Sequence, residues 1–164
     1  MRLIAQIKSL APALALLAVA GCQVPHGAAA VLRRPELVAA GPGPVDAVVR
    51  AALAQSQRQG RRLVVYVSAT WCQPCERFQA SLRAGQLDGY FPDLRFFKFD
   101  QDQDAARLEV AGYGGQYIPR FVVPGADGRG TAQRMEGGTK ADDTVFTSIG
   151  PRLQAMLAGG GGPH

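Results

Sequence analysis

The stretch that decides the fold is Trp71-Cys72-Gln73-Pro74-Cys75, in a chain of 164 residues. Two cysteines separated by two residues can close a small disulfide. They can also share the first turn of a helix, where a thiolate is stabilised. This combination is typical of thiol–disulfide exchange chemistry. This chemistry needs the cysteine pair at the start of a helix, so the secondary structure predicted on either side of the pair decides between the two possibilities.

A predicted strand and a predicted helix flank the cysteine pair. The β-branched run over residues 63–67 predicts a buried strand. Phe78 and Leu82 fall on one face of a helix that resumes after Cys72. The unpaired N–H groups and the dipole of a helix start favour negative charge. We therefore expect Cys72 to be the nucleophilic thiolate and Cys75, one turn inside the helix, to be the resolving thiol.

The other periodic segments predict helices that alternate with strands. Apolar residues at helical spacing predict a helix from Val45 to Gln59. A last helix, capped by Thr139 or Asp142, is expected to bend or break at Gly150-Pro151. This order predicts an α/β fold with a mixed sheet. The remaining expected elements are strands over residues 94–99, 121–123 and 131–135, a helix over 105–110 and a turn over 124–128.

Ile118-Pro119 stands immediately before the third expected strand. A proline suits the entrance of a strand but not a central position in a hydrogen-bonded ladder. A cis bond at this place would turn the chain sharply and leave the backbone groups of Ile118 free to pair with an extended substrate. These two residues are therefore the second candidate element of the site.

The chain resembles the thioredoxin superfamily over about residues 44–158. Trp71-Cys72-Gln73-Pro74-Cys75 resembles the active-site motif of that superfamily, and residues 113–119 resemble the approach to its cis-proline. Residues 97–101 resemble the strand that comes before, and Gly137 or Gly138 matches a glycine that lines the substrate groove. The resemblance implies a thioredoxin fold, in which a central mixed β-sheet is flanked by helices.

The resemblance also implies roles for individual residues. Cys72 would attack the substrate disulfide, Cys75 would resolve the mixed disulfide, and together they would form the redox-active disulfide. No cofactor and no metal are implied. The residues expected to line the substrate groove are Trp71, Gln73, Pro74, Ile118 and Pro119.

Two positions depart from the superfamily pattern. Tyr66 stands where thioredoxins usually carry a buried aspartate that helps to deprotonate the second cysteine. Phe96 stands where a lysine often pairs with that acid. We expect both aromatic residues in the core. Proton transfer to and from Cys75 would then depend on water or on the neighbouring Glu76.

Two other interpretations of the cysteine pair stay open from the residues alone. A zinc site needs about four ligands, and the two histidines, His26 and His164, lie in segments that we expect to be flexible. A purely structural disulfide would close so short a loop that it removes little entropy from the unfolded chain.

A calcium loop is disfavoured because Asp100, Asp102 and Asp104 lack the glycine and the closing glutamate of an EF-hand.

The first 21 residues have the pattern of a signal peptide. Arg2 and Lys8 give a positive start, and the apolar run over residues 10–20 is shorter than the roughly 20 residues of a spanning helix. Small residues before Cys22 resemble the lipobox of bacterial lipoproteins, whose cysteine carries lipid, although Val19 stands where leucine is commonest. Lipid on Cys22 also leaves the other two cysteines as a closed pair. The alternatives are a plain secretory signal with a chance cysteine and an uncleaved anchor.

The composition then shifts to alanine, proline and glycine, which predicts a flexible linker. Removing the first 21 residues takes away two of the 18 basic residues and none of the 13 acidic ones, so the net charge becomes 16 − 13 = +3. This charge is too mild to indicate a nucleic-acid partner. The predicted segments are a lipoprotein signal peptide (1–21), an Ala/Pro/Gly-rich linker (22–43), a thioredoxin-like domain (44–158) and a disordered Gly-rich tail (159–164).

Together these features predict a thiol–disulfide oxidoreductase of the bacterial cell envelope, anchored to a membrane on the periplasmic side by lipid on Cys22. Its expected substrates are exported proteins with disulfides, and its expected electron donor is a membrane thiol reductant, because the extracytoplasmic space is oxidising. Pro74 and Ile118 resemble the residues of thioredoxins that reduce their substrates, which favours a reductase. The alternatives are a disulfide-forming oxidase and a non-catalytic, lipid-anchored binding module that uses the groove around Trp71 and Pro119.

Overall fold

The computed structural model describes residues 32–137, 145 and 147–159. Within this part of the chain, five strands form one sheet in the order β1-β3-β2-β4-β5. The parallel strands are β1 (Glu36–Ala39), β3 (Leu94–Asp100) and β2 (Arg62–Ser68). β4 (Arg120–Pro124) is antiparallel to β2, and β5 (Gly130–Glu136) is antiparallel to β4. The mixed α/β sheet predicted from the sequence is therefore confirmed.

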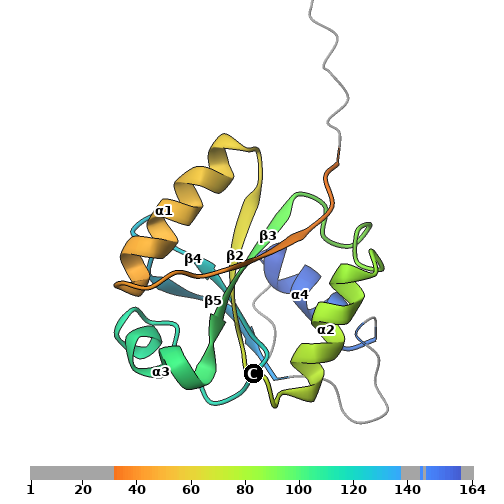
Figure 1. The fold of residues 1–164 in the computed structure, drawn as a ribbon. Coiled ribbons are helices and arrows are strands. Elements are labelled where there is room, and N and C mark those ends of the chain that lie inside the picture. Colours follow the sequence, from red (N-terminus) through yellow and green to blue (C-terminus); the bar gives the residue numbers. More distant parts are fainter. Residues whose placement is uncertain (1–31, 138–144, 146, 160–164) are drawn as a thin grey trace, which may run out of the picture. The chain divides into compact units, whose positions relative to one another are not determined.

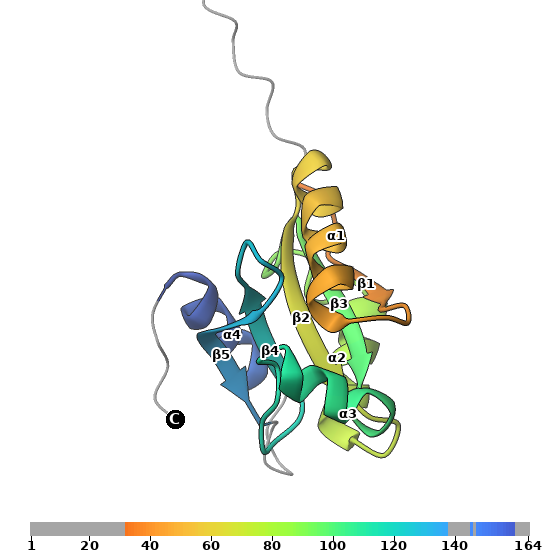
Figure 2. The same cartoon turned by 90° about the vertical axis from the view of Figure 1, so that its left-hand side faces the viewer.

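Helices cover both faces of the sheet. α1 (Val45–Arg58) and α3 (Gln101–Val110) lie on one face, and α2 (Gln73–Arg83) and α4 (Ile149–Leu157) lie on the other (Figure 1). Figure 2 shows α4 beside the edge strand β5, which it contacts. Each face carries its own cluster of buried apolar side chains.

The central strand β2 positions the site because both of its faces are buried. Val65 and Val67 enter the cluster under α1 and α3, whereas Val64 and Tyr66 enter the cluster under α2 and α4. Complete burial of one such side chain stabilises the fold by about 1.5–3 kcal/mol. The C-terminal end of β2, from which the chain enters the cysteine motif, is therefore held firmly from both sides.

The predicted linker over residues 22–43 is wrong at its C-terminal end. Glu36–Ala39 form β1 and pair in parallel with β3. The nearly buried Arg95 side chain forms an ion pair with Glu36 and donates a hydrogen bond to Ser56 Oγ (3.1 Å). Four residues among alanine, proline and glycine carry little strand signal of their own, so contacts with distant parts of the chain decide this strand.

Two helix boundaries also differ from the prediction. α3 begins at Gln101 instead of residue 105, because the Asp100 carboxylate accepts hydrogen bonds from the backbone N–H groups of Asp102 (2.9 Å) and Gln103 (3.2 Å). Gly150-Pro151 lie in the first turn of α4 instead of breaking a longer helix. A proline there removes no intrahelical hydrogen bond.

Several predicted features lie outside the described residues. They are the signal peptide, Cys22, most of the linker, Gly138, the proposed caps Thr139 and Asp142, and residues 160–164 of the tail. Across residues 32–137 and 147–159, no helix has both the length and the apolar character needed to span a bilayer.

Candidate active site

β2 leads directly into the cysteine motif. After β2 ends at Ser68, Cys72 occupies the N-cap position of α2, and Pro74 and Cys75 lie in the first turn. The two cysteines form a disulfide with an S–S distance of 1.97 Å. The backbone N–H of Cys75 points at Cys72 Sγ, at a distance of 3.2 Å. The predicted order of strand, cysteine pair and helix start is therefore confirmed.

The two sulfur atoms differ in their surroundings. Cys72 is 4 % exposed, whereas Cys75 has no exposed surface. Once the disulfide is reduced, the N-terminus of α2 stabilises a thiolate at Cys72, because the helix dipole and the Cys75 N–H are directed at that sulfur. A substrate therefore meets Cys72 first, and Cys75 reaches the resulting mixed disulfide from inside the protein. This is the order of attack and resolution that disulfide exchange requires.

The Ile118–Pro119 peptide bond is cis, as the sequence predicted. β4 begins at the next residue, and Arg120 pairs with Val67 near the C-terminal end of β2. Pro119 is buried, and Ile118 is half-buried against both apolar clusters. The two predicted site elements, far apart in sequence, thus meet at the same end of the sheet.

Trp71 is 66 % exposed, yet its indole has a fixed partner. Its Nε1–H donates a hydrogen bond to Asp102 Oδ2 at 2.9 Å. Asp102 lies in the first turn of α3, whose N-cap is Asp100. One of the three aspartates considered above for a calcium loop, Asp102, therefore orients the aromatic residue next to Cys72. The exposed Gln73 and half-buried Pro74 complete this side of the expected groove.

Tyr66 takes the place of a buried acid beside the resolving cysteine. Its side chain is fully buried, and its hydroxyl donates a hydrogen bond to the Cys75 carbonyl oxygen (3.3 Å) and accepts one from Gln79 Nε2 (3.3 Å). Burial raises the pKa of Tyr66 to about 12, so the hydroxyl stays protonated near neutral pH. Phe96 is also fully buried, as predicted. Glu76 lies exposed on α2.

The raised pKa of Tyr66 predicts a loss of stability in alkali. The pKa is about 12 in the folded chain and 10.0 for an ordinary tyrosine, so the stabilisation is complete below pH 10 and disappears as the pH rises through about 12. At about pH 11 the wild type should have lost about 1 kcal/mol more than Tyr66→Phe, relative to about pH 8. Urea unfolding followed by circular dichroism at both pH values measures this difference. Equal alkaline losses in the two proteins would contradict it.

Sequence reasoning missed the residues that hold the site from outside the motif. Besides Asp102, these are Arg120, Arg134 and Glu136, which contact the loop before Pro119. The available signals were a charged residue directly after the cis-proline and the alternation of Arg134 and Glu136 on one face of β5. Among the described residues, no group of three or more histidine, cysteine, aspartate or glutamate side chains could hold a metal ion.

Comparison with known proteins identifies the family. No protein-family model matches the chain. The chain is 33 % identical to the H-type thioredoxin of Chlamydomonas reinhardtii over 108 residues, which are 66 % of this chain and 82 % of that protein. The chain belongs to the thioredoxin family. It is also 37 % identical to mitochondrial thioredoxin-3 of Saccharomyces cerevisiae over 75 residues, 44 % of this chain and 53 % of that protein.

Among solved structures, a mutant thioredoxin from Halobacterium salinarum aligns with 80 % of this chain and 96 % of its own, at 17 % identity and a TM-score of 0.48.

Within the thioredoxin family, the Cys72–Cys75 pair at the start of α2 makes this protein a thiol–disulfide oxidoreductase. The five-stranded mixed sheet with helices on both faces is its thioredoxin fold.

Proposed function

We propose that this thioredoxin is a lipid-anchored reductase that acts on the disulfides of exported proteins, on the periplasmic side of the bacterial cell envelope. The observation that carries the proposal is the Cys72–Cys75 disulfide at the start of α2, beside a cis-proline. Pro74 and Ile118 resemble the residues of thioredoxins that work as reductants. The pattern of the first 22 residues supports export and lipid attachment at Cys22.

The proposed reaction balances as an exchange of two electrons. The Cys72 thiolate attacks one sulfur of the substrate disulfide, forming a mixed disulfide and releasing the other substrate sulfur as a thiolate. The Cys75 thiolate then attacks Cys72 Sγ, which releases the second substrate thiolate and leaves the Cys72–Cys75 disulfide. A membrane thiol reductant restores the dithiol, because an extracytoplasmic space does not itself supply reducing equivalents.

One experiment in cells tests both parts of the proposal. The full chain is expressed with radiolabelled fatty acid in a bacterium that has two membranes. The cells are then quenched in acid and their free thiols alkylated with a reagent that adds mass. We expect the wild type to carry the label, with Cys72 and Cys75 mostly alkylated, because a reductase is kept reduced by its donor. Cys22→Ala should carry no label. The Cys72→Ser/Cys75→Ser double variant identifies the unalkylated band.

The same measurement separates two of the alternatives, and a pull-down of partners from the same cells separates the third. A Cys72–Cys75 pair that is mostly oxidised at steady state would contradict the reductase and support a disulfide-forming oxidase. Equal labelling of the wild type and Cys22→Ala would remove the lipid anchor. A chain that captures partners equally well without either cysteine would support a non-catalytic binding module.

A further inference from the structure

Tyr117, two residues before the cis-proline, has a hydrogen-bonded backbone and an exposed side chain. Its backbone N–H and that of Gln116 donate hydrogen bonds to Glu136 Oε2, at 3.1 and 3.0 Å. Its carbonyl oxygen accepts a hydrogen bond from Arg120 Nη1 at 3.2 Å. The tyrosine side chain is nevertheless 58 % exposed. The protein therefore holds a large aromatic ring in solvent on a backbone with little freedom to move.

The two side chains that hold Tyr117 are themselves fixed. Arg120 is 1 % exposed and donates to Gln101 Oε1 at 2.8 Å. A Cβ atom at Gly115 would collide with Glu136 Oε1 and would lie 2.8 Å from Arg120 Nη1, so the absence of a side chain at Gly115 lets the loop pack closely against the ends of both side chains. Charged hydrogen bonds from buried groups are among the stronger ones in proteins. Hydrogen bonds to Arg120 of β4 and Glu136 of β5 thus hold the loop before Pro119 against these two strands.

A second clamp holds the start of the same loop. Arg134 on β5 donates hydrogen bonds to the carbonyl oxygens of Gly112 (2.6 Å) and Gly114 (2.9 Å). Three charged side chains from two strands therefore hydrogen-bond to the backbone of four of the six residues from 112 to 117. Tyr117 joins these hydrogen bonds through its backbone. Holding the loop before the cis-proline therefore does not itself require an aromatic side chain at this position.

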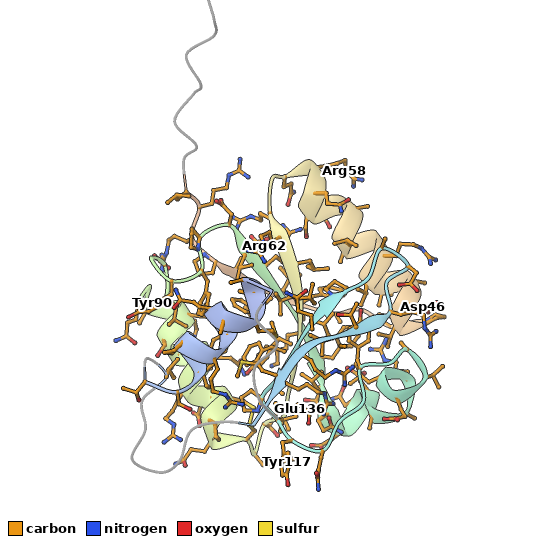
Figure 3. The ribbon with its side chains drawn as sticks, turned by 180° about the vertical axis from the view of Figure 1, so that it is seen from behind. Asp46, Arg58, Arg62, Tyr90, Tyr117 and Glu136 are labelled. Carbon is orange, nitrogen blue, oxygen red and sulfur yellow. A yellow bond between two sulfur atoms is a disulfide. The ribbon has the colours of Figure 1, made fainter. Side chains whose placement is uncertain are left out.

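Tyr117 lies at the end of the sheet that carries the cysteine pair. It extends from the lower end of the molecule beside Glu136 in Figure 3, and the connection from β2 to α2 is at the lower end in Figure 1. Arg120 links its loop to Gln101 in α3, and the next residue of α3, Asp102, holds the exposed Trp71. Trp71 beside the cysteine pair and Tyr117 beside the cis-proline are thus both exposed aromatic residues that hydrogen bonds hold in place.

We propose that Tyr117 contacts the substrate and, with Trp71, favours disulfides whose cysteine has an apolar or aromatic neighbour. Aromatic rings give a large contact area and lose little conformational entropy when a partner binds. Glu136 and Arg120 are positioning residues that hold the Tyr117 backbone, and bond exchange remains at Cys72. The inference rests on the thiol–disulfide exchange described above and adds a preference among its substrates.

Two synthetic peptide disulfides test the preference. They are identical except that the residues on both sides of the cysteine are Phe in one and Ser in the other. The reduced full chain is mixed with each peptide, and its oxidation is followed by the fluorescence of Trp71, the single tryptophan. We expect the wild type to react about fivefold faster with the Phe peptide, and this ratio to fall below about twofold in Tyr117→Ala. Tyr117→Phe should keep the wild-type ratio.

Tyr90→Ala is the matched control, because Tyr90 is also an exposed tyrosine but lies between α2 and β3, away from Tyr117 (Figure 3). It should keep the wild-type ratio. The inference is overturned if Tyr117→Ala keeps that ratio or if the wild type shows no preference. Oxidation of the wild type by neither peptide would overturn the exchange function itself, and the inference with it.

Discussion

Replacing Cys72 with serine is expected to lower the rate of disulfide reduction at least about a thousandfold, to the uncatalysed background. Cys72 holds the sulfur at the N-terminus of α2, toward which the Cys75 N–H points. A serine hydroxyl in its place cannot form the mixed disulfide that the exchange needs. The rate is measured with the full chain, a dithiol donor and a model protein disulfide.

Cys75→Ser is the matched variant, because it also replaces one sulfur by oxygen and also removes the internal disulfide. Its expected behaviour is different. Cys72 still attacks the substrate, but no second thiolate is present to resolve the product, so mixed disulfides accumulate at Cys72. Non-reducing electrophoresis should show covalent complexes with Cys75→Ser and none with Cys72→Ser. Purification of these complexes from cells would identify the natural substrates.

The comparison is decisive because both variants share any destabilisation caused by loss of the disulfide. If Cys72→Ser reduced the substrate at the wild-type rate, the assignment of the nucleophile would be wrong. If both variants trapped substrates equally, the buried Cys75 would be as reactive toward substrate as Cys72, and the order of attack derived from their burial would fail.

The chemistry of this protein could be predicted from sequence because its signals are local. A β-branched run, a cysteine pair at a helix start and a proline at a strand entrance each occupy a few neighbouring residues, and the structure has β2, Cys72, Cys75 and the cis Pro119 where these signals placed them. The family resemblance added the expectation that the segments meet. Pairing of Arg120 with Val67 shows how they do so.

The contacts that support the site could not be predicted, because each joins residues far apart in the chain. Trp71 donates a hydrogen bond to Asp102 in α3, and the backbone of Tyr117 donates one to Glu136 in β5. β1 was missed for the same reason, since its four residues form a strand only against β3. Local propensity describes such positions poorly, because packing and pairing with distant neighbours decide their conformation.

Phe78→Ala is expected to lower the free energy of unfolding by about 3–5 kcal/mol. Phe78 is fully buried on α2, one turn beyond Cys75. Its ring centroid lies 5.3 Å from that of Tyr66, 5.2 Å from that of Phe96 and 5.0 Å from that of Phe121. The first pair is tilted and the other two are edge-on, and such ring pairs are each worth about 0.5–1.5 kcal/mol beyond the area that they bury. The substitution therefore leaves a cavity between the active-site helix and three strands of the sheet.

Because domains of this size are stable by only about 5–15 kcal/mol, Phe78→Ala should be close to unfolding in conditions where the wild type is stable. Urea unfolding of the oxidised full chain, followed by circular dichroism, measures the change. Val110→Ala is the control, since Val110 is a strongly exposed residue of α3, and it should change stability by less than about 0.5 kcal/mol. Phe78→Leu should recover part of the loss by refilling the cavity. A loss below about 1 kcal/mol in Phe78→Ala would mean that neighbouring side chains collapse into the space, and that the ring cluster is not what fixes α2 to the sheet.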